Sequence, residues 1–354
     1  MSKWMCVSVV VAACTSSSSS PQVATGELGA WLAAPPLPVA RANHCSVAID
    51  NWVLAIGGNR SDGNGGFVNT DEIDAAQVAA DGTLGAWQVA GHLPSPGSQS
   101  TCTSDGHTLY VIDGIFDDAS KGSQVWSGDF SVGGTFESPL VSLGALPNDT
   151  YAISEAATVI DGTLLVTTSN TSDDTNEPDQ TFTIETPIGG GAPLAWSIDA
   201  WQGVDFRAAS QLAFSTTTAY VLGGYHDPAA GAITDTFDAP IGAAGALGTA
   251  VATTELPAPV AFGRAAVIDD WMFVVGGRPQ VYTGGGSTTV YSAPIAHDGS
   301  LGAWTMPTAL SAPRTNFALA LVGEYLVLTG GGNDGPGDTM VLVAQARGLA
   351  AKPD

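Results

Sequence analysis

Basic side chains are scarce in this 354-residue chain, which has ten Lys and Arg against 34 Asp and Glu and a formal net charge of −24 at pH 7. A surface that binds nucleic acid needs clustered Lys and Arg to neutralise phosphates, so the composition excludes a general nucleic-acid-binding role. Charged residues of all kinds are only 12% of the chain, whereas hydrophobic residues are 44%. The chain can therefore bury a large core, and we interpret its acidity as a solvated surface.

The sequence also lacks long apolar runs and helical periodicity. No run reaches the roughly 18 apolar residues that would span a bilayer as a helix. The 44 Gly and 21 Pro are fewer than a disordered, low-complexity chain would carry. Short apolar runs between Gly, Asp and Pro turns favour an all-β protein.

The first twenty residues have the pattern of a secretory leader. A basic start at Lys3 is followed by a short apolar stretch, and Val11-Ala12-Ala13-Cys14 resembles the lipobox of bacterial lipoproteins. That resemblance implies a signal peptide over 1–13, a lipid on Cys14, and a Ser-rich tether over 14–25. It also implies an exported protein, and Thr15 after the cysteine favours the outer membrane or the cell surface. The alternatives are a buried first strand or a leader cut elsewhere.

Cysteine is rare, with four in the chain. Cys6 lies in the leader and Cys14 is the predicted lipid site, which leaves Cys45 and Cys102. Neither belongs to a CxxC pair, which argues against a zinc site. Two alternatives stay open for this pair: a disulfide between the innermost strands of adjacent units, which an exported protein would retain, or two small buried thiols.

Three phrases recur at one period along the chain. The clearest is an apolar run that ends in two glycines, as in Trp52–Gly58 and Trp271–Gly277. The end of this run, which we call the anchor, falls at positions 57, 113, 168, 223, 276 and 330, spaced by 53 to 56 residues. The second and third copies lack the double glycine. A Leu-Gly-Ala-Trp phrase and a Leu-Pro pair follow the same period.

Each unit contains four short apolar runs, which indicates four strands. In the first unit we expect strands at about Asn43–Ile49, Trp52–Ile56, Thr70–Ala79 and Gly85–Ala90. A four-stranded unit of roughly 50 residues is typical of a propeller blade. The double glycine would end the second strand where φ is positive or bulk would clash. The Trp of the outer strand is expected to pack on the next blade.

The Val-Leu-Ala-Ile-Gly-Gly strand followed by Trp87 resembles a kelch repeat, and the likeness covers about residues 26–350. The last unit ends without its Leu-Gly-x-Trp phrase, and the spare copy, Gly26–Trp31, lies upstream of the first unit. We therefore predict a six-bladed β-propeller that an N-terminal strand closes, with 351–354 as a tail.

The resemblance places one face of the ring at the loops that follow the anchors. Arg41, Arg207 and Arg314 each lie 16 residues before an anchor, and the chain has only seven Arg. We consider two roles for them: they ring the mouth of the channel and face loop aspartates such as Asp227, or they pair with neighbouring carboxylates and blade carbonyls. The candidate binding face comprises Arg41, Arg60, Asp62, Asp117, Asp118, Arg207, Tyr225, His226, Arg278, Tyr282 and Arg314.

The sequence favours a noncatalytic module that binds a protein or a glycan, since no catalytic motif is evident. The alternative is a carbohydrate-active enzyme similar to the kelch sialic-acid mutarotases, which would need Arg, Tyr and acid groups to converge at the mouth. No cofactor is expected, although a calcium-stabilised shell is a third hypothesis. We expect a monomer that meets the membrane only through its lipid.

Overall fold

The computed structural model describes residues 26–146, 153–170, 180–188, 194–205, 207–227, 229–281, 284–333 and 337–346. The predicted leader, the tether, Cys14, Tyr282 and the C-terminal tail lie outside these ranges. In the part of the chain that is described, no helix is long and apolar enough to cross a bilayer.

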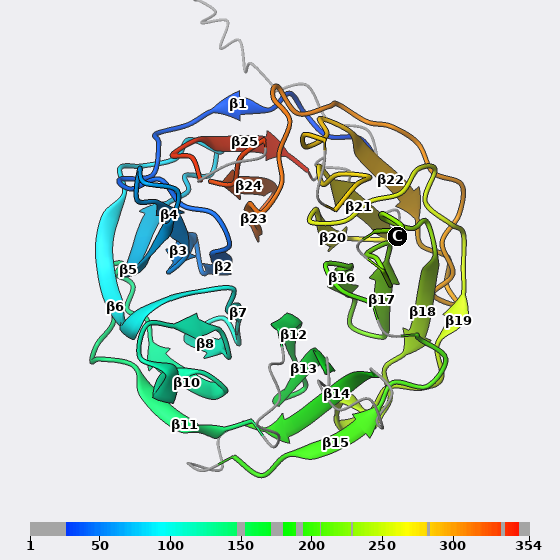
Figure 1. Ribbon diagram of the computed structural model, residues 1–354, viewed down its shortest axis with the longest axis horizontal. Coiled ribbons are helices and arrows are strands. Elements are labelled where there is room, and N and C mark those ends of the chain that lie inside the picture. The colour runs from blue at the N-terminus through cyan, green and yellow to red at the C-terminus, as the bar shows by residue number, and fades with distance from the viewer. Residues whose placement is uncertain are drawn as a thin grey trace, which may run out of the picture.

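Six antiparallel sheets stand around a common axis as the blades of a β-propeller, which confirms the predicted fold class (Figure 1). The innermost strand of each blade lies beside the axis, and the core consists of apolar clusters between neighbouring blades. In chain order the strands of blades one to three are β2 Cys45–Ile49, β3 Trp52–Ile56, β5 Phe67–Gln77 and β6 Gln88–Ser98; β7 Thr101–Ser104, β8 Thr108–Ile112, β10 Gln124–Asp129 and β11 Val141–Ala145; and β12 Ile153–Ile160, β13 Thr163–Asn170, β14 Gln180–Pro187 and β15 Ser197–Ala200.

The strands of blades four to six are β16 Gln211–Phe214, β17 Thr218–Leu222, β18 Thr236–Pro240 and β19 Val251–Ala252; β20 Arg264–Ile268, β21 Trp271–Val275 and β22 Val290–Pro294; and β23 Ala318–Val322, β24 Tyr325–Thr329, β25 Val341–Gln345 and β1 Leu32–Ala33. Blade one has an added hairpin strand, β4 Asn59–Ser61, and also pairs with β9 Ile115–Phe116 from the loop of blade two. Two short 3-10 turns, η1 Ala119–Lys121 and η2 Ala243–Gly245, lie between strands.

The N-terminal strand closes the ring, as the misplaced copy of the Leu-Gly-x-Trp phrase predicts. Strand β1 pairs antiparallel with β25, with Leu32 opposite Val343 and Ala33 opposite Leu342 (Figure 1). Gly29 N–H donates to the carbonyl of Gln345 at 2.8 Å, which extends the pairing. Blade six thus takes its outer strand from the opposite end of the chain, and no blade edge is left open there.

The paired glycines adopt left-handed conformations at the end of the second strand, as predicted from their spacing. Gly57, for example, has φ +58°, and a Cβ there would lie 2.7 Å from the carbonyl oxygen of Gly97. The degenerate anchor of blade two keeps this conformation, because Asp113 has φ +56°. Asp tolerates the left-handed region better than most side chains, which explains how this copy lost its first glycine.

The outer Trp residues pack on the preceding blade, so the expectation of a contact with the next blade is wrong. Trp87 Nε1 donates to the carbonyl of Pro35 in blade six at 2.9 Å. The same bond recurs from Trp31, Trp196 and Trp304 to the carbonyls of Thr308, Ala145 and Thr254. The turn before the Trp also contacts the preceding blade. Its glycine, such as Gly82, packs so closely on the ring of Tyr325 that a Cβ at this position would clash.

Candidate functional site

We call the end of the ring where the anchor glycines lie the mouth. The three Arg residues placed 16 before an anchor are buried beneath it, with exposed fractions of 0% for Arg41, 1% for Arg207 and 3% for Arg314. The Nη1 atom of each donates to the carbonyl of its own anchor, Gly57, Gly223 or Gly330, at 3.1 to 3.4 Å. The spacing of 16 therefore serves the blade, and the mouth-facing role is wrong for these three residues.

Two of these guanidinium groups also have carboxylate partners. Arg41 Nη2 forms a fully buried ion pair with Asp74, and Arg314 Nη2 lies 3.0 Å from Asp338. Burial raises the pKa of Asp74 above its usual value, against the opposing pull of Arg41. The second hypothesis for these Arg residues, that they pair with carboxylates and carbonyls, is the one the structure supports.

A belt of left-handed residues runs around the axis at the mouth through five of the six blades. Each lies 14 residues before its anchor, where the chain turns into an innermost strand, and φ is between 52° and 59° at all five: Asn43, Gln99, Ala209, Phe262 and Asn316. The backbone N–H of one residue donates to the carbonyl of its counterpart in the adjacent blade. These bonds run from Gln99 to Asn43, from Asn43 to Asn316, from Asn316 to Phe262 and from Phe262 to Ala209, at 2.7 to 3.2 Å.

The belt presents polar and aromatic side chains at the mouth. All five of its side chains are partly exposed. Asn43 Nδ2 donates weakly to Asn59 Oδ1 at 3.3 Å, whereas the amides of Gln99 and Asn316 have no side-chain hydrogen bond within the described residues. Asn suits a left-handed backbone, but Phe does not, so Phe262 is the unusual member.

Phe262 lies between two predicted site residues, Tyr225 and Arg278. The Phe262 and Tyr225 rings are 6.0 Å apart at their centroids, and the Arg278 guanidinium lies 4.6 Å from the centroid of Phe262. Backbone hydrogen bonds hold the loops in place, since Arg278 N donates to Ala261 O at 2.8 Å. The sequence pattern identified Tyr225 and Arg278 but not Phe262, which its repeat position alone would have singled out. His226 follows Tyr225 and is exposed.

The predicted aspartates on the rim of blades one and two hold their own loops. Asp62 accepts from the backbone N–H groups of Asn64 and Gly66, which lowers its pKa. Asp118 caps η1 through Ser120 N, and Asp117 Oδ1 accepts from Asn69 Nδ2 at 2.8 Å. Arg60 is exposed on β4. The Asn69–Asp117 bond ties the β4–β5 hairpin to the loop of blade two, and three apolar side chains stay exposed on these two segments: Phe67, Val68 and Ile115.

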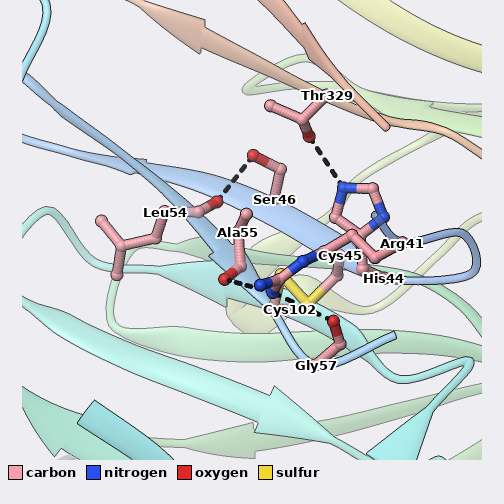
Figure 2. The surroundings of a disulfide bond; sticks show 9 residues. All are labelled: Arg41, His44, Cys45, Ser46, Leu54, Ala55, Gly57, Cys102 and Thr329. Carbon is pink, nitrogen blue, oxygen red and sulfur yellow. Dashed lines mark hydrogen bonds between the residues drawn. A yellow bond between two sulfur atoms is a disulfide. The ribbon is translucent and has the colours of Figure 1, made fainter. Parts of the chain in front are cut away.

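The structure joins Cys45 and Cys102 in a disulfide between β2 and β7, the innermost strands of blades one and two, with their Cα atoms 5.9 Å apart (Figure 2). Beside it lies His44, which is 1% exposed and whose Nε2 is 2.8 Å from Thr329 Oγ1. Burial, and next the charges of Arg41 and Arg264, hold the pKa of His44 well below its usual value.

Within the described residues, no group of three or more His, Cys, Asp or Glu side chains lies close enough to hold a metal ion. The arrangement at the mouth is instead one of hydrogen-bonding amides, stacked aromatic rings and guanidinium groups. Such groups can hold and orient a ligand.

No family model matches the chain, and no curated protein matches it. Among solved structures it is similar to one titled "Structure of YjhT", with a TM-score of 0.62, 14% sequence identity, and coverage of 88% of this chain and 96% of that one. At this identity the likeness shows the fold alone, and it agrees with the six-bladed propeller seen here.

Proposed function

We propose that this protein is a noncatalytic binding propeller of the kelch-like type, exported and held at a membrane surface by a lipid on Cys14, and that its mouth binds a glycan. The observation that carries the proposal is the stack of Tyr225, Phe262 and Arg278 beside the amides of the belt. Sugars present apolar ring faces that pack on aromatic side chains and hydroxyls that pair with amides.

The position of Phe262 supports a role in binding rather than in folding. A left-handed backbone costs a bulky side chain of the order of 1 kcal/mol or more, and Asn at the equivalent positions 43 and 316 avoids most of that cost. Phe262 is also partly exposed, so it does not recover the cost through full burial. A strained, partly exposed aromatic residue beside the loops of the mouth is typical of a binding site.

The test is a glycan array followed by calorimetric titration of the best ligand against two variants. Phe262→Asn removes the ring and keeps a residue that the belt already accepts, and it should weaken binding at least tenfold, as expected for a lost stacking contact of about 1.4 kcal/mol. Ala209→Asn makes the matched change at a belt position without an aromatic residue and should bind like the wild type. Equal affinity in the wild type and Phe262→Asn would overturn the glycan site.

The carbohydrate-active alternative is separable in the same experiment. The bound glycan is followed by proton NMR in the presence of catalytic amounts of protein. Faster anomer exchange or cleavage than in buffer would support an enzyme of the sialic-acid mutarotase type, and an unchanged ligand supports a binding module. An array without glycan hits would turn attention to a protein ligand at the exposed Phe67, Val68 and Ile115.

The anchor is tested separately. Cys14→Ala should release the protein from the membrane fraction of cells that export it, because a lipid chain is the proposed membrane contact. A mutant that still sediments with membranes would refute the anchor without affecting the glycan site.

A further inference from the structure

Arg264 occupies a position beside the axis where the other blades carry neutral side chains. It begins β20 and lies opposite Val275, the residue before the anchor of blade five. The residues at the same register in blades one, four and six are Cys45, Gln211 and Ala318. The layer immediately beneath the belt thus holds a cation at one point of the ring.

Among the residues that the structure describes, the guanidinium of Arg264 lacks the anchor carbonyl and the carboxylate that Arg41 and Arg314 each contact. Its Nη1 donates a hydrogen bond to the carbonyl of Gly263, the residue before it, at 2.9 Å. Within the described residues it forms no ion pair, whereas Arg41 pairs with Asp74 and Arg314 pairs with Asp338. A guanidinium has five N–H donors, so most of its hydrogen-bonding capacity faces no protein acceptor.

The surroundings of Arg264 make this charge costly. The side chain is only partly exposed, and its partial burial lowers the pKa of the guanidinium. The charge of Arg264, like that of Arg41, contributes to lowering the pKa of buried His44. Burial of a charge without a counterion is unfavourable, so proteins pair such groups or bind an ion there. Arg41 and Arg264 thus place positive charge near the axis in a chain whose net charge is −24.

We propose that Arg264 binds a small carboxylate anion from solution at the axis of the ring, beneath the mouth. A carboxylate fits because its two oxygens accept two parallel bonds from the planar fork of a guanidinium. At the same register in other blades, the disulfide-bonded Cys45, the amide of Gln211 and the methyl group of Ala318 carry no competing negative charge. The proposal is independent of the glycan site, because the anion contacts Arg264 rather than the aromatic stack.

The test is thermal unfolding with sodium acetate as the probe, against a low-salt Tris–HEPES reference, with sodium chloride and sodium phosphate at matched ionic strength. Acetate should raise the melting temperature of the wild type, and the half-saturating concentration should be at least tenfold higher in Arg264→Gln. Gln is a suitable replacement because Gln211 occupies the equivalent position in blade four. Arg60→Gln, which removes an exposed cation on the rim, is the matched control and should respond like the wild type.

The melting temperatures in the reference buffer give a second test, in which the variant should be at least as stable as the wild type. Without acetate, Arg264→Gln should melt at the same temperature as the wild type or higher, because the substitution removes an unpaired charge. Arg264→Lys keeps the charge without the fork and should lose the preference for acetate over chloride. Equal responses of the wild type and Arg264→Gln to acetate would overturn the site, and a wild-type response to chloride or phosphate but not to acetate would overturn the carboxylate assignment.

Discussion

The closing strand offers the sharpest test of how this ring is stabilised. Trp31 is 8% exposed and packs in the apolar cluster between blades five and six, while its Nε1 donates to Thr308 O at 3.2 Å. Trp31→Ala should lower the free energy of unfolding by about 3–5 kcal/mol, the range for truncating a buried Trp. We expect a loss near the upper end of this range. Strand β1 pairs with β25 through only two registered residues, so the packing of Trp31 contributes much of what holds the strand in place.

Trp304→Ala is the matched control. Trp304 makes the equivalent hydrogen bond, to Thr254 O at 3.1 Å, but it is partly exposed, and the chain continues on both sides of its blade. Its truncation should therefore cost less, in proportion to the smaller apolar area that it buries. Equilibrium unfolding in urea measures both variants, and limited proteolysis should cut Trp31→Ala first near β1. Equal losses of stability in the two variants, with no early cut near β1, would refute the argument that the N-terminal strand is the weak closure of the ring.

Two further perturbations follow from the inner strands. His44→Phe introduces the residue found at the equivalent position of blade six, Phe317, and should make the free energy of unfolding less dependent on pH. Because the pKa of His44 is depressed in the folded state, its contribution to the free energy of unfolding is fully present above about pH 6.5 and falls by about 1.4 kcal/mol per pH unit below that value. Urea unfolding at two pH values measures the difference, with substitution of the exposed His92 by Gln as the control. The double substitution of Cys45 and Cys102 by Ser should lower the free energy of unfolding by roughly 4 kcal/mol, the value that the chain-entropy model gives for a separation of 57 residues. Thiol titration of the denatured, unreduced wild type should find no free thiol from these two cysteines, and two free thiols would contradict the disulfide.

The fold could be predicted from the sequence because its determinants are local and repeated. The anchor glycines of four blades indicate a left-handed backbone at a fixed point of the blade, and the displaced Gly26–Trp31 phrase indicates which blade is incomplete. The direction of the Trp31 and Trp87 contacts could not be predicted in this way. It depends on which neighbouring blade the preceding turn leans against, which is a property of the twist of the sheets and not of the spacing.

The site was less accessible to sequence reasoning. Spacing selects Arg41, Arg207 and Arg314 because they recur, yet the recurrence reflects a hydrogen bond within three of the blades, from the guanidinium to the carbonyl of the anchor. Tyr225 and Arg278 were found as loop residues, but the ring that joins them, Phe262, lies at the start of an inner strand and was overlooked.

A repeat protein separates structural from functional residues by a simple physical criterion. A residue that recurs at one register in several blades meets the same backbone in each and satisfies the blade, as the outer Trp and the three buried Arg residues do. A residue that breaks the pattern at such a register has no such partner and adds something that the blade does not need. Two residues are of this second kind: Phe262, which stands among the amides of the belt, and Arg264, which stands among the neutral side chains below it. Only Gly263 separates them in the chain. Because both exceptions fall in blade five, one at the mouth and one in the layer beneath it, the two proposed binding sites lie on the same side of the ring.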